Sequence, residues 1–209
     1  PVPFLIKPLK TKYFTDKIKF LKFMPNLPLS FNNYKKNNYD IRLEDGFKES
    51  VNGLWENFSK NIKVSVNRDK EYLDWRYNKK PGENYKIAAA YLDGRQTGLV
   101  VFTTKEKHNG KIGYIMELIY DLENPKVAKQ LLNFAVSEIK KEKADCILAW
   151  SLEHSPSYAV FSKKWFLKMP EKIRPIELHF GCRAFDEKLD TLLSARENWY
   201  LSYSDSDTV

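Results

Sequence analysis

Residues 68–77 read RDKEYLDWRY and bring three aromatic rings, two arginines and three carboxylates into ten positions. Arg76 carries a planar guanidinium, which binds a carboxylate or a phosphate through two parallel hydrogen bonds. Aromatic rings around such a group are typical of a small-molecule pocket. The rings that we expect to line it belong to Trp75, Tyr114, Trp150 and Tyr158. The alternative is that these side chains pack in the core and at its rim, which is the commoner use of large rings.

Glu117 is a second candidate, because it interrupts the apolar run YIMELIY at residues 114–120. A carboxyl group buried between Met116 and Leu118 would be suited to proton transfer. The alternative is a glutamate on the exposed side of a half-buried strand.

Two helices are expected ahead of the apolar run. Apolar residues recur at steps of three and four between Glu44 and Lys60, which predicts an amphipathic helix. RDKEYLDWRY predicts a second helix, with Asn67 as its cap and an end near Asn78, ahead of Pro81. We expect Trp75 to be largely buried. We expect Arg76 to be partly exposed or paired with a carboxylate, because an unpaired buried charge is unfavourable.

From residue 85 the apolar period changes to two. Turns at Asp93-Gly94 and Asn109-Gly110 then predict a three-stranded antiparallel meander over residues 85–120. A long amphipathic helix over 125–143 and a strand, CILAWS, follow. The remaining elements are expected to be a short helix over 156–164, two strands, FLKM and PIELHFGCR, and a last helix over 186–197. This order predicts an α+β fold with a mixed sheet, in which a right-handed crossover makes CILAWS parallel to YIMELIY.

Composition narrows the possible partners. Residues 1–40 hold eight lysines against two aspartates, so most of the net charge of +8 belongs to this segment and a nucleic-acid surface on the folded body is not indicated. His108, His154 and His179 are too scattered for a metal site. No apolar run is long enough for a membrane helix or a signal peptide. Cys146 and Cys182 both lie in apolar contexts, which favours reduced thiols and a cytoplasmic protein.

Three segments carry a resemblance to a known family. The stretch RDKEYLDWRYNKKPGENY and the end NWYLSYSDSDTV are similar to parts of a subgroup of bacterial GNAT N-acetyltransferases. The start VPFLIKPL is similar to the junction that follows the first GNAT domain in members with two domains. The resemblance covers about residues 40–209 and implies a GNAT-like mixed β-sheet with an antiparallel meander and flanking helices. It also implies that residues 1–38 are a basic linker and strand from a preceding domain, and that 39–209 form a C-terminal GNAT-like domain.

The resemblance implies acetyl-CoA as cofactor and a small-molecule amine as acceptor. GNAT enzymes hold the pyrophosphate with a glycine-rich loop before the long helix, but here the loop reads YDLENPKVAKQ, without glycine. Its acidic residues are expected to satisfy the helix start themselves; the alternative is that Lys126 or Lys129 binds phosphate. Glu117 matches the position of the family's general base. The family's tyrosine acid would stand at Phe161, which lacks a hydroxyl, and Tyr158 lies one turn earlier.

The leading hypothesis is therefore an N-acyltransferase domain that shapes the acceptor site while a preceding GNAT domain binds acetyl-CoA. The chain by itself is then expected to bind acetyl-CoA weakly or not at all. A self-sufficient acetyltransferase with a divergent loop is the second hypothesis. A non-catalytic module that binds a charged small molecule or a partner is the third.

Overall fold

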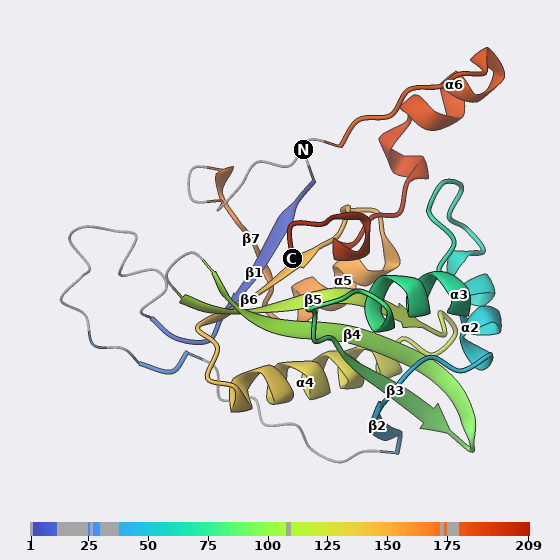
Figure 1. Ribbon diagram of the computed structural model, residues 1–209. Coiled ribbons are helices and arrows are strands. Elements are labelled where there is room, and N and C mark those ends of the chain that lie inside the picture. Colours follow the sequence, from blue (N-terminus) through green and yellow to red (C-terminus); the bar gives the residue numbers. More distant parts are fainter. Residues whose placement is uncertain are drawn as a thin grey trace.

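The computed structural model describes residues 2–11, 25, 27–29, 38–107, 110–171, 174 and 180–209. The strands are β1 (Phe4–Pro8), β2 (Asp40–Glu44), β3 (Lys86–Leu92), β4 (Arg95–Lys107), β5 (Gly110–Tyr120), β6 (Cys146–Trp150) and β7 (Leu167–Lys168). The α-helices are α2 (Ser50–Ser59), α3 (Lys70–Leu73), α4 (Lys126–Lys141), α5 (Pro156–Lys163) and α6 (Glu187–Ser194). Figure 1 shows α4 along one face of the sheet and α2 with α3 on the other.

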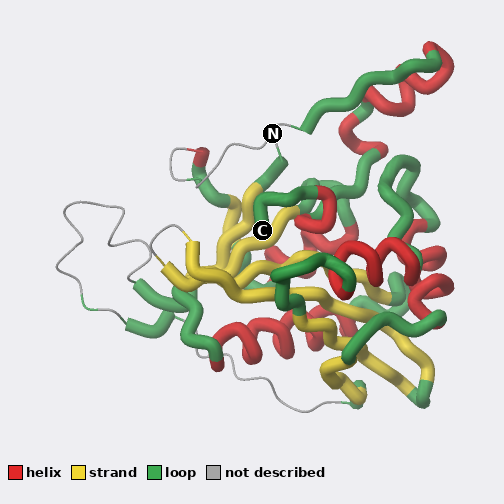
Figure 2. The backbone as a smooth tube through the Cα atoms, viewed as in Figure 1, coloured by secondary structure: helices red, strands yellow, loops and turns green. Residues whose placement is uncertain are grey.

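The seven strands form one sheet in the order β2-β3-β4-β5-β6-β1-β7. The predicted meander is confirmed, since β3, β4 and β5 pair antiparallel. The connection between β4 and β5, at 108–109, lies outside the described residues. The parallel pairing of CILAWS with YIMELIY is also confirmed, because β5 and β6 run parallel and α4 connects them. Figure 2 shows the strands gathered in this single sheet between the helices.

The strand β1 is an inner strand of this sheet, although we expected residues 1–38 to lie outside the domain. It pairs antiparallel with β6 on one side and with β7 on the other. Its residues Phe4, Leu5 and Ile6 are buried. Of the two expected closing strands, FLKM forms only the two residues of β7, and residues 175–179 of PIELHFGCR lie outside the described part. The sheet is therefore completed beside β6 by the N-terminal strand.

The expected helix from Glu44 begins too early. Asp40–Glu44 is the edge strand β2, paired with β3, and the helix α2 starts at Ser50. The strand was missed because its alternating charged residues are mostly exposed at the edge of the sheet, which weakens the apolar signal. The buried residues of α2 are still those that the helical spacing predicts: Val51, Leu54, Trp55 and Phe58.

Two glycines allow α4 to approach the sheet closely. A Cβ atom on Gly98 would lie 2.7 Å from Leu131 Cδ1, and one on Gly113 would overlap the side chain of Ile139. Leu131 and Ile139 are fully buried on the inner face of α4. The contact fixes α4 against β4 and β5, and so fixes the loop that precedes α4.

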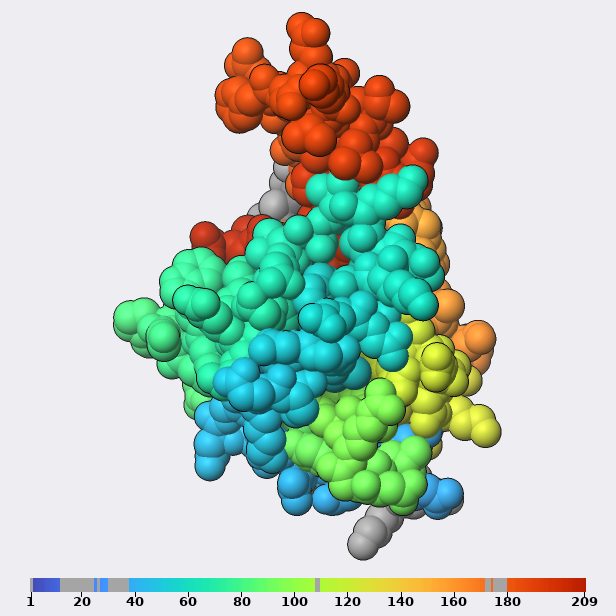
Figure 3. Space-filling model, turned by 90° about the vertical axis from the view of Figure 1, so that its right-hand side faces the viewer, coloured from blue at the N-terminus to red at the C-terminus, as the bar shows by residue number. Residues whose placement is uncertain are grey.

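The segment that carries α6 projects from the body, as Figure 3 shows in orange-red. The helix has no buried residue, although the expected last helix is present at nearly the expected position. The chain then returns through a short 3-10 turn, η4 (Arg196–Asn198), and the segment 200–209 crosses back over the sheet. This returning segment shapes the candidate site.

Candidate functional site

The two parallel strands separate beyond Ile115. Pairing of β5 with β6 covers only Ile112–Ile115 and Cys146–Ala149, while β5 continues to Tyr120. A β-bulge near Met116 also shifts the register between β4 and β5, since Val101 pairs with Glu117 and Phe102 with Ile115. Bulges of this kind redirect side chains. The result is a cleft between diverging strands, with Glu117 beside it.

The C-terminal segment fills this cleft. Tyr200, Leu201 and Ser202 line the remaining space together with β5, Trp150, Ser151, Ser157 and Phe161, and the space that is left is about 10 Å³. A cavity must hold at least about 10–15 Å³ of probe-occupied volume to accept one water molecule. The cleft is therefore closed in this conformation.

The Glu117 carboxylate is the centre of a buried hydrogen-bond network. Its Oε1 accepts from Tyr200 Oη at 2.5 Å and from the Leu118 N–H at 3.0 Å. Its Oε2 accepts from Arg68 Nε at 3.2 Å, Ser202 Oγ at 2.8 Å and Ser204 Oγ at 2.9 Å. A carboxylate has about four lone-pair sites. Five donors therefore leave Glu117 no site for the proton of a substrate amine.

Arg68 is the cation of this network, and sequence reasoning did not single it out. It has no solvent exposure, and its Nη2 lies 2.5 Å from Asp205 Oδ2. Burial lowers the pKa of Arg68, but Glu117 and Asp205 raise it further, to above its ordinary value. Burial raises the pKa of Asp205, and Arg68 offsets part of that effect. Arg68 thus joins β5 to the C-terminal segment as a fully charged bridge.

Arg76 is buried, and of the two expected environments it has the second, a carboxylate partner, in Asp207. Only 4% of it is accessible, and its Nε and Nη2 donate to the carbonyls of Ser204 and Ser206 at 3.0 and 2.6 Å. The carboxylate of Asp207 lies 3.8 Å from Nη2 and is itself exposed. Arg76 therefore holds the C-terminal segment in place through Nε and Nη2, while its Nη1 is buried without a hydrogen-bond partner among the described residues.

The expected burial of Trp75 is wrong, since 61% of this residue is exposed. The reason is the backbone: α3 is capped by Asp69, not Asn67, and continues as a π-helical turn, η2 (Asp74–Asn78). A π-helical turn contains an extra residue, so the inward face shifts relative to a regular α-helix. Arg76 and Tyr77 are buried, and Trp75 faces outward against the half-buried Tyr72.

The other expected pocket residues do not come together around an open pocket, since Trp150 lines only the closed cleft. Tyr114 and Trp150 are buried around Tyr203, with Trp150 stacked on its ring at a centroid distance of 4.2 Å. Tyr158, on α5, is half-buried at the rim of the core. The structure therefore places Tyr114 and Trp150 in the core, which is the alternative reading of these residues.

The loop before α4 uses its own acceptors. The N–H groups of Glu123 and Asn124 donate to the Asp121 carboxylate and carbonyl at 3.1 and 2.9 Å, and Val127 N–H donates to the Asn124 carbonyl. Pro125 has no N–H to offer. Asp121 also accepts from Asn57 Nδ2 of α2. The N–H groups of the loop are thus occupied by Asp121, but no side chain of the described residues caps α4 and no acidic residue lies in its first turn, so the expected satisfaction of the helix start by carboxylates is wrong.

Beside this loop, Lys126 and Lys129 line a cavity of about 500 Å³ together with Lys164. Burial and the nearby Lys129 lower the pKa of Lys164. No carboxylate lines the cavity; the other lining residues are Asn38, Tyr39, Leu92, Asn124 and Gln130. Among the described residues, none pairs with these three lysines as an ion-pair partner. An anion is the ligand that such a lining fits.

Other kinds of site are not indicated in the described part of the chain. No group of histidine, cysteine, aspartate or glutamate residues there could hold a metal ion. No helix there is long and apolar enough to cross a membrane.

Comparison with known proteins identifies the fold. No family model matches the sequence, and no curated protein matches it. Saccharomyces cerevisiae N-myristoyltransferase with bound myristoyl-CoA is similar in structure, with a TM-score of 0.51 at 14% identity. The match covers 78% of this chain and 44% of that one, so the chain spans less than half of that enzyme.

Two further structures are similar at lower scores. Glucosamine-6-phosphate N-acetyltransferase from Arabidopsis thaliana has 18% identity and a TM-score of 0.46, over 72% of this chain and all of that one (100%). The GCN5-related glucosamine N-acetyltransferase region of a fungal multi-domain GH3 β-N-acetylglucosaminidase has 18% identity and a TM-score of 0.42, over 58% of this chain and 14% of that one. The likeness to the N-myristoyltransferase structure supports the fold class that the sequence predicted, a GNAT-like mixed sheet with an antiparallel meander, a parallel β5–β6 pair and flanking helices.

Proposed function

We propose that this chain is the C-terminal GNAT-like domain of a two-domain bacterial N-acyltransferase. In this arrangement a preceding domain binds acetyl-CoA, and this domain shapes the site of a small-molecule amine acceptor. The observation that carries the proposal is the closed cleft: Tyr200–Ser202 occupy the space between β5 and β6, with about 10 Å³ remaining. In the GNAT fold the opening between the diverging strands is where an acyl-CoA would be expected to enter.

The residues around the cleft also support a domain that shapes the acceptor site and does not itself carry out proton transfer. Glu117 is occupied by five donors and by the Arg68 ion pair, so it is not free to accept a proton from an amine. Phe161, at the position of the family's tyrosine acid, is buried and has no hydroxyl. A domain with neither a free base nor a free acid at these positions contributes by binding and shape.

A second candidate function rests on the cavity lined by Lys126, Lys129 and Lys164. If this cavity holds the phosphates of acetyl-CoA, the chain is a self-sufficient acetyltransferase with a divergent cofactor loop. The cavity of about 500 Å³ and its cationic lining favour this alternative. It also requires the C-terminal segment to leave the cleft, so that the thioester can reach an amine.

Calorimetry with acetyl-CoA separates the two functions. For the chain studied alone, we expect no saturable heat up to millimolar cofactor. For the protein that includes the upstream domain, we expect saturable binding together with acetyl transfer to an amine. Micromolar binding to the chain alone, lost in a Lys126→Gln/Lys129→Gln variant, would contradict the first function and establish the second. Lys60→Gln is a suitable control, because Lys60 is exposed and distant in sequence from the cavity lining.

A further inference from the structure

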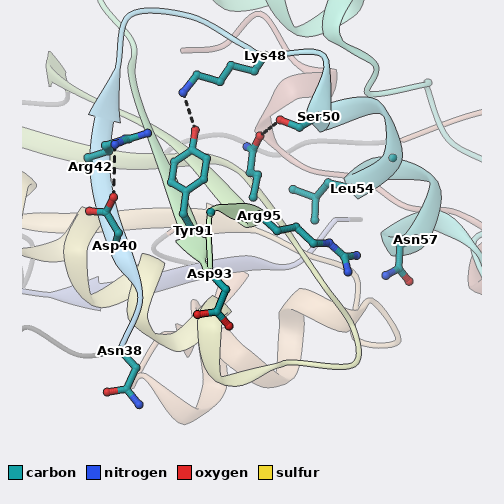
Figure 4. Close-up of a pocket in the computed structure, with 13 residues that line it drawn as sticks. Asn38, Asp40, Arg42, Lys48, Ser50, Leu54, Asn57, Tyr91, Asp93 and Arg95 are labelled. Carbon is teal, nitrogen blue, oxygen red and sulfur yellow. Dashed lines mark hydrogen bonds and ion pairs between the residues drawn. The ribbon is translucent and has the colours of Figure 1, made fainter.

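A separate cavity of about 700 Å³ lies at the β2 edge of the sheet. Figure 4 shows it between β2, the first half of α2 and the turn that joins β3 to β4. Its lining residues are Asn38, Asp40, Arg42, Lys48, Ser50, Gly53, Leu54, Asn57, Tyr91, Asp93, Gly94, Arg95 and Gln96. Ligand pockets typically have volumes of about 300–1,000 Å³. None of these residues belongs to the closed cleft.

The inner wall of this cavity is a fixed polar cluster around Tyr91, which is 9% exposed. Glu44 Oε1 accepts from Tyr91 Oη, Lys48 Nζ and Arg42 Nε at 2.8, 3.0 and 3.1 Å. The Arg42 guanidinium also lies over the Tyr91 ring, 4.6 Å from its centroid. Arg42 and Lys48 share this one carboxylate oxygen, so each side chain keeps N–H groups that Glu44 does not use. The wall is rich in donors, and the side chains of Arg42 and Lys48 that supply them are about half exposed.

Two charges at the turn remain outside this cluster. Asp93 and Arg95 are exposed, and neither makes an ion pair or a side-chain hydrogen bond with any residue in the described ranges. They do not pair with each other, although only Gly94 separates them. Figure 4 shows Arg95 extending toward Asn57 and α2, whereas the Asp93 carboxylate points away from it. Asp40 lies across the cavity on β2 and is paired with Arg42 at 3.4 Å. The cavity therefore presents unpaired charges of both signs at separate places.

The backbone fixes where these two charges stand. Asp93 and Gly94 have φ angles of 49° and 78°, as in the tight turns that join the strands of a hairpin. The turn holds Asp93 and Arg95 at the end of two paired strands, so they are not on a long loop. A site on strands and a tight turn is positioned more precisely than one on an irregular loop.

We propose that this cavity binds a small zwitterion, with its anionic group on Arg95 and its ammonium group on Asp93. The arginine fork matches a carboxylate or a phosphate through two parallel hydrogen bonds. The Asp93 carboxylate supplies acceptors for the N–H groups of an ammonium ion. A ligand with only one charge would satisfy half of the site. This site is independent of acyl transfer and of which domain binds the cofactor.

Three related probes test the proposal by calorimetry on the whole chain. O-Phosphoethanolamine carries both charges, ethanolamine only the ammonium, and inorganic phosphate only the anion. We expect O-phosphoethanolamine to bind at least ten times more tightly than either single-charge probe, which corresponds to about 1.4 kcal/mol. If inorganic phosphate binds as tightly as O-phosphoethanolamine, or if the zwitterion does not bind at millimolar concentrations, the proposal is overturned.

Variants test whether the binding is at this cavity. Arg95→Gln and Asp93→Asn are each expected to weaken binding of O-phosphoethanolamine at least tenfold. Asparagine tolerates a positive φ, so Asp93→Asn preserves the turn. The matched controls are Lys60→Gln and Glu56→Gln, which remove the same charges from exposed positions outside the cavity lining. Equal binding by Arg95→Gln and Lys60→Gln would show that the zwitterion binds elsewhere and would refute the site.

Discussion

Arg68 Nε lies 3.2 Å from Glu117 Oε2, and neither side chain has any exposure to solvent. An arginine from the connection ahead of α3 is thus paired with a carboxylate on β5 at the point where the strands separate. Removing one partner of a buried pair leaves an uncompensated charge, which costs about 3–5 kcal/mol. We expect Arg68→Met to lower the free energy of unfolding by that amount in urea titrations. An effect below 1 kcal/mol would contradict the network.

The matched control for that variant is Arg196→Met. Arg196 Nη2 pairs with Glu153 at 2.8 Å, but about half of the Arg196 side chain is exposed. Exposed ion pairs contribute about 0–1 kcal/mol. The control removes one arginine from an exposed ion pair, whereas Arg68→Met removes one arginine from two buried pairs, with Glu117 and Asp205, so a larger loss in Arg68→Met is expected from burial and from the second pair.

Acid stability is expected to depend on Glu153. Burial raises the pKa of Glu153, but Arg196 and Lys168 lower it more, to about 2. A carboxyl with a lowered pKa in the folded state stabilises the protein above its unfolded pKa of about 4.3, and that contribution is lost as the pH falls toward 2. Glu153→Gln should therefore flatten the loss of stability between these two pH values, as measured by thermal melts at stepped pH.

The change in stability caused by Glu153→Gln should be small, because the Glu153 side chain is 38% exposed and solvent screens its ion pairs with Arg196 and Lys168. Glu56→Gln is the control, since Glu56 is exposed and forms no ion pair with the described residues. If Glu153→Gln and Glu56→Gln give the same pH profile, the two ion pairs do not hold in solution.

Trp75→Ala should have little effect on stability, despite the size of the ring. Because 61% of Trp75 is exposed, its removal leaves no buried cavity, and we expect a change of about 1 kcal/mol or less. Leu73, two residues earlier, is fully buried, and Leu73→Ala should cost about 2–5 kcal/mol. Thermal denaturation of the two variants compares the faces of this helix directly. A large loss in Trp75→Ala alone would reverse the assignment of the faces.

Two glycine-to-alanine changes should change the free energy of unfolding in opposite directions. In Gly113→Ala the new methyl group would overlap the Ile139 side chain of α4, and we expect a loss of about 1–3 kcal/mol. Gly53 lies within α2 with nothing within 4 Å of its expected Cβ, so Gly53→Ala should raise stability by about 0.5–1 kcal/mol. Urea titrations of both variants test the close approach of α4 to β5.

Local patterns were enough to predict most elements but not their partners. The meander follows from a change of apolar period, and the parallel β6 follows from the long helix that precedes it, and both signals lie in consecutive residues of the chain. The place of β1 cannot be seen in this way, because its partner Trp150 stands far along the chain. Likewise β2 is an edge strand with charged residues, and its pattern resembles that of an exposed loop.

The site illustrates the same limit. Glu117 can be picked out from the sequence because it interrupts an apolar strand. Its hydrogen-bond partners Tyr200, Ser202 and Ser204 cannot, because they lie near the C-terminal end of the sequence. Arg68 is one charged residue in a charged stretch, and nothing local indicates that it is fully buried. Trp75 was misplaced because a period of 3.6 was assumed where the helix contains a π-helical turn.

The position of β1 has a consequence for the order in which the protein folds. Phe4 pairs with Trp150 and Ile6 pairs with Leu167, so β1 lies between two strands from the last third of the chain. Contacts between residues so far apart in sequence slow folding, because a long loop must close before they form. During synthesis the apolar strand Phe4–Pro8 has no partner until β6 has emerged from the ribosome. A chaperone is therefore expected to bind this segment while the chain is still growing.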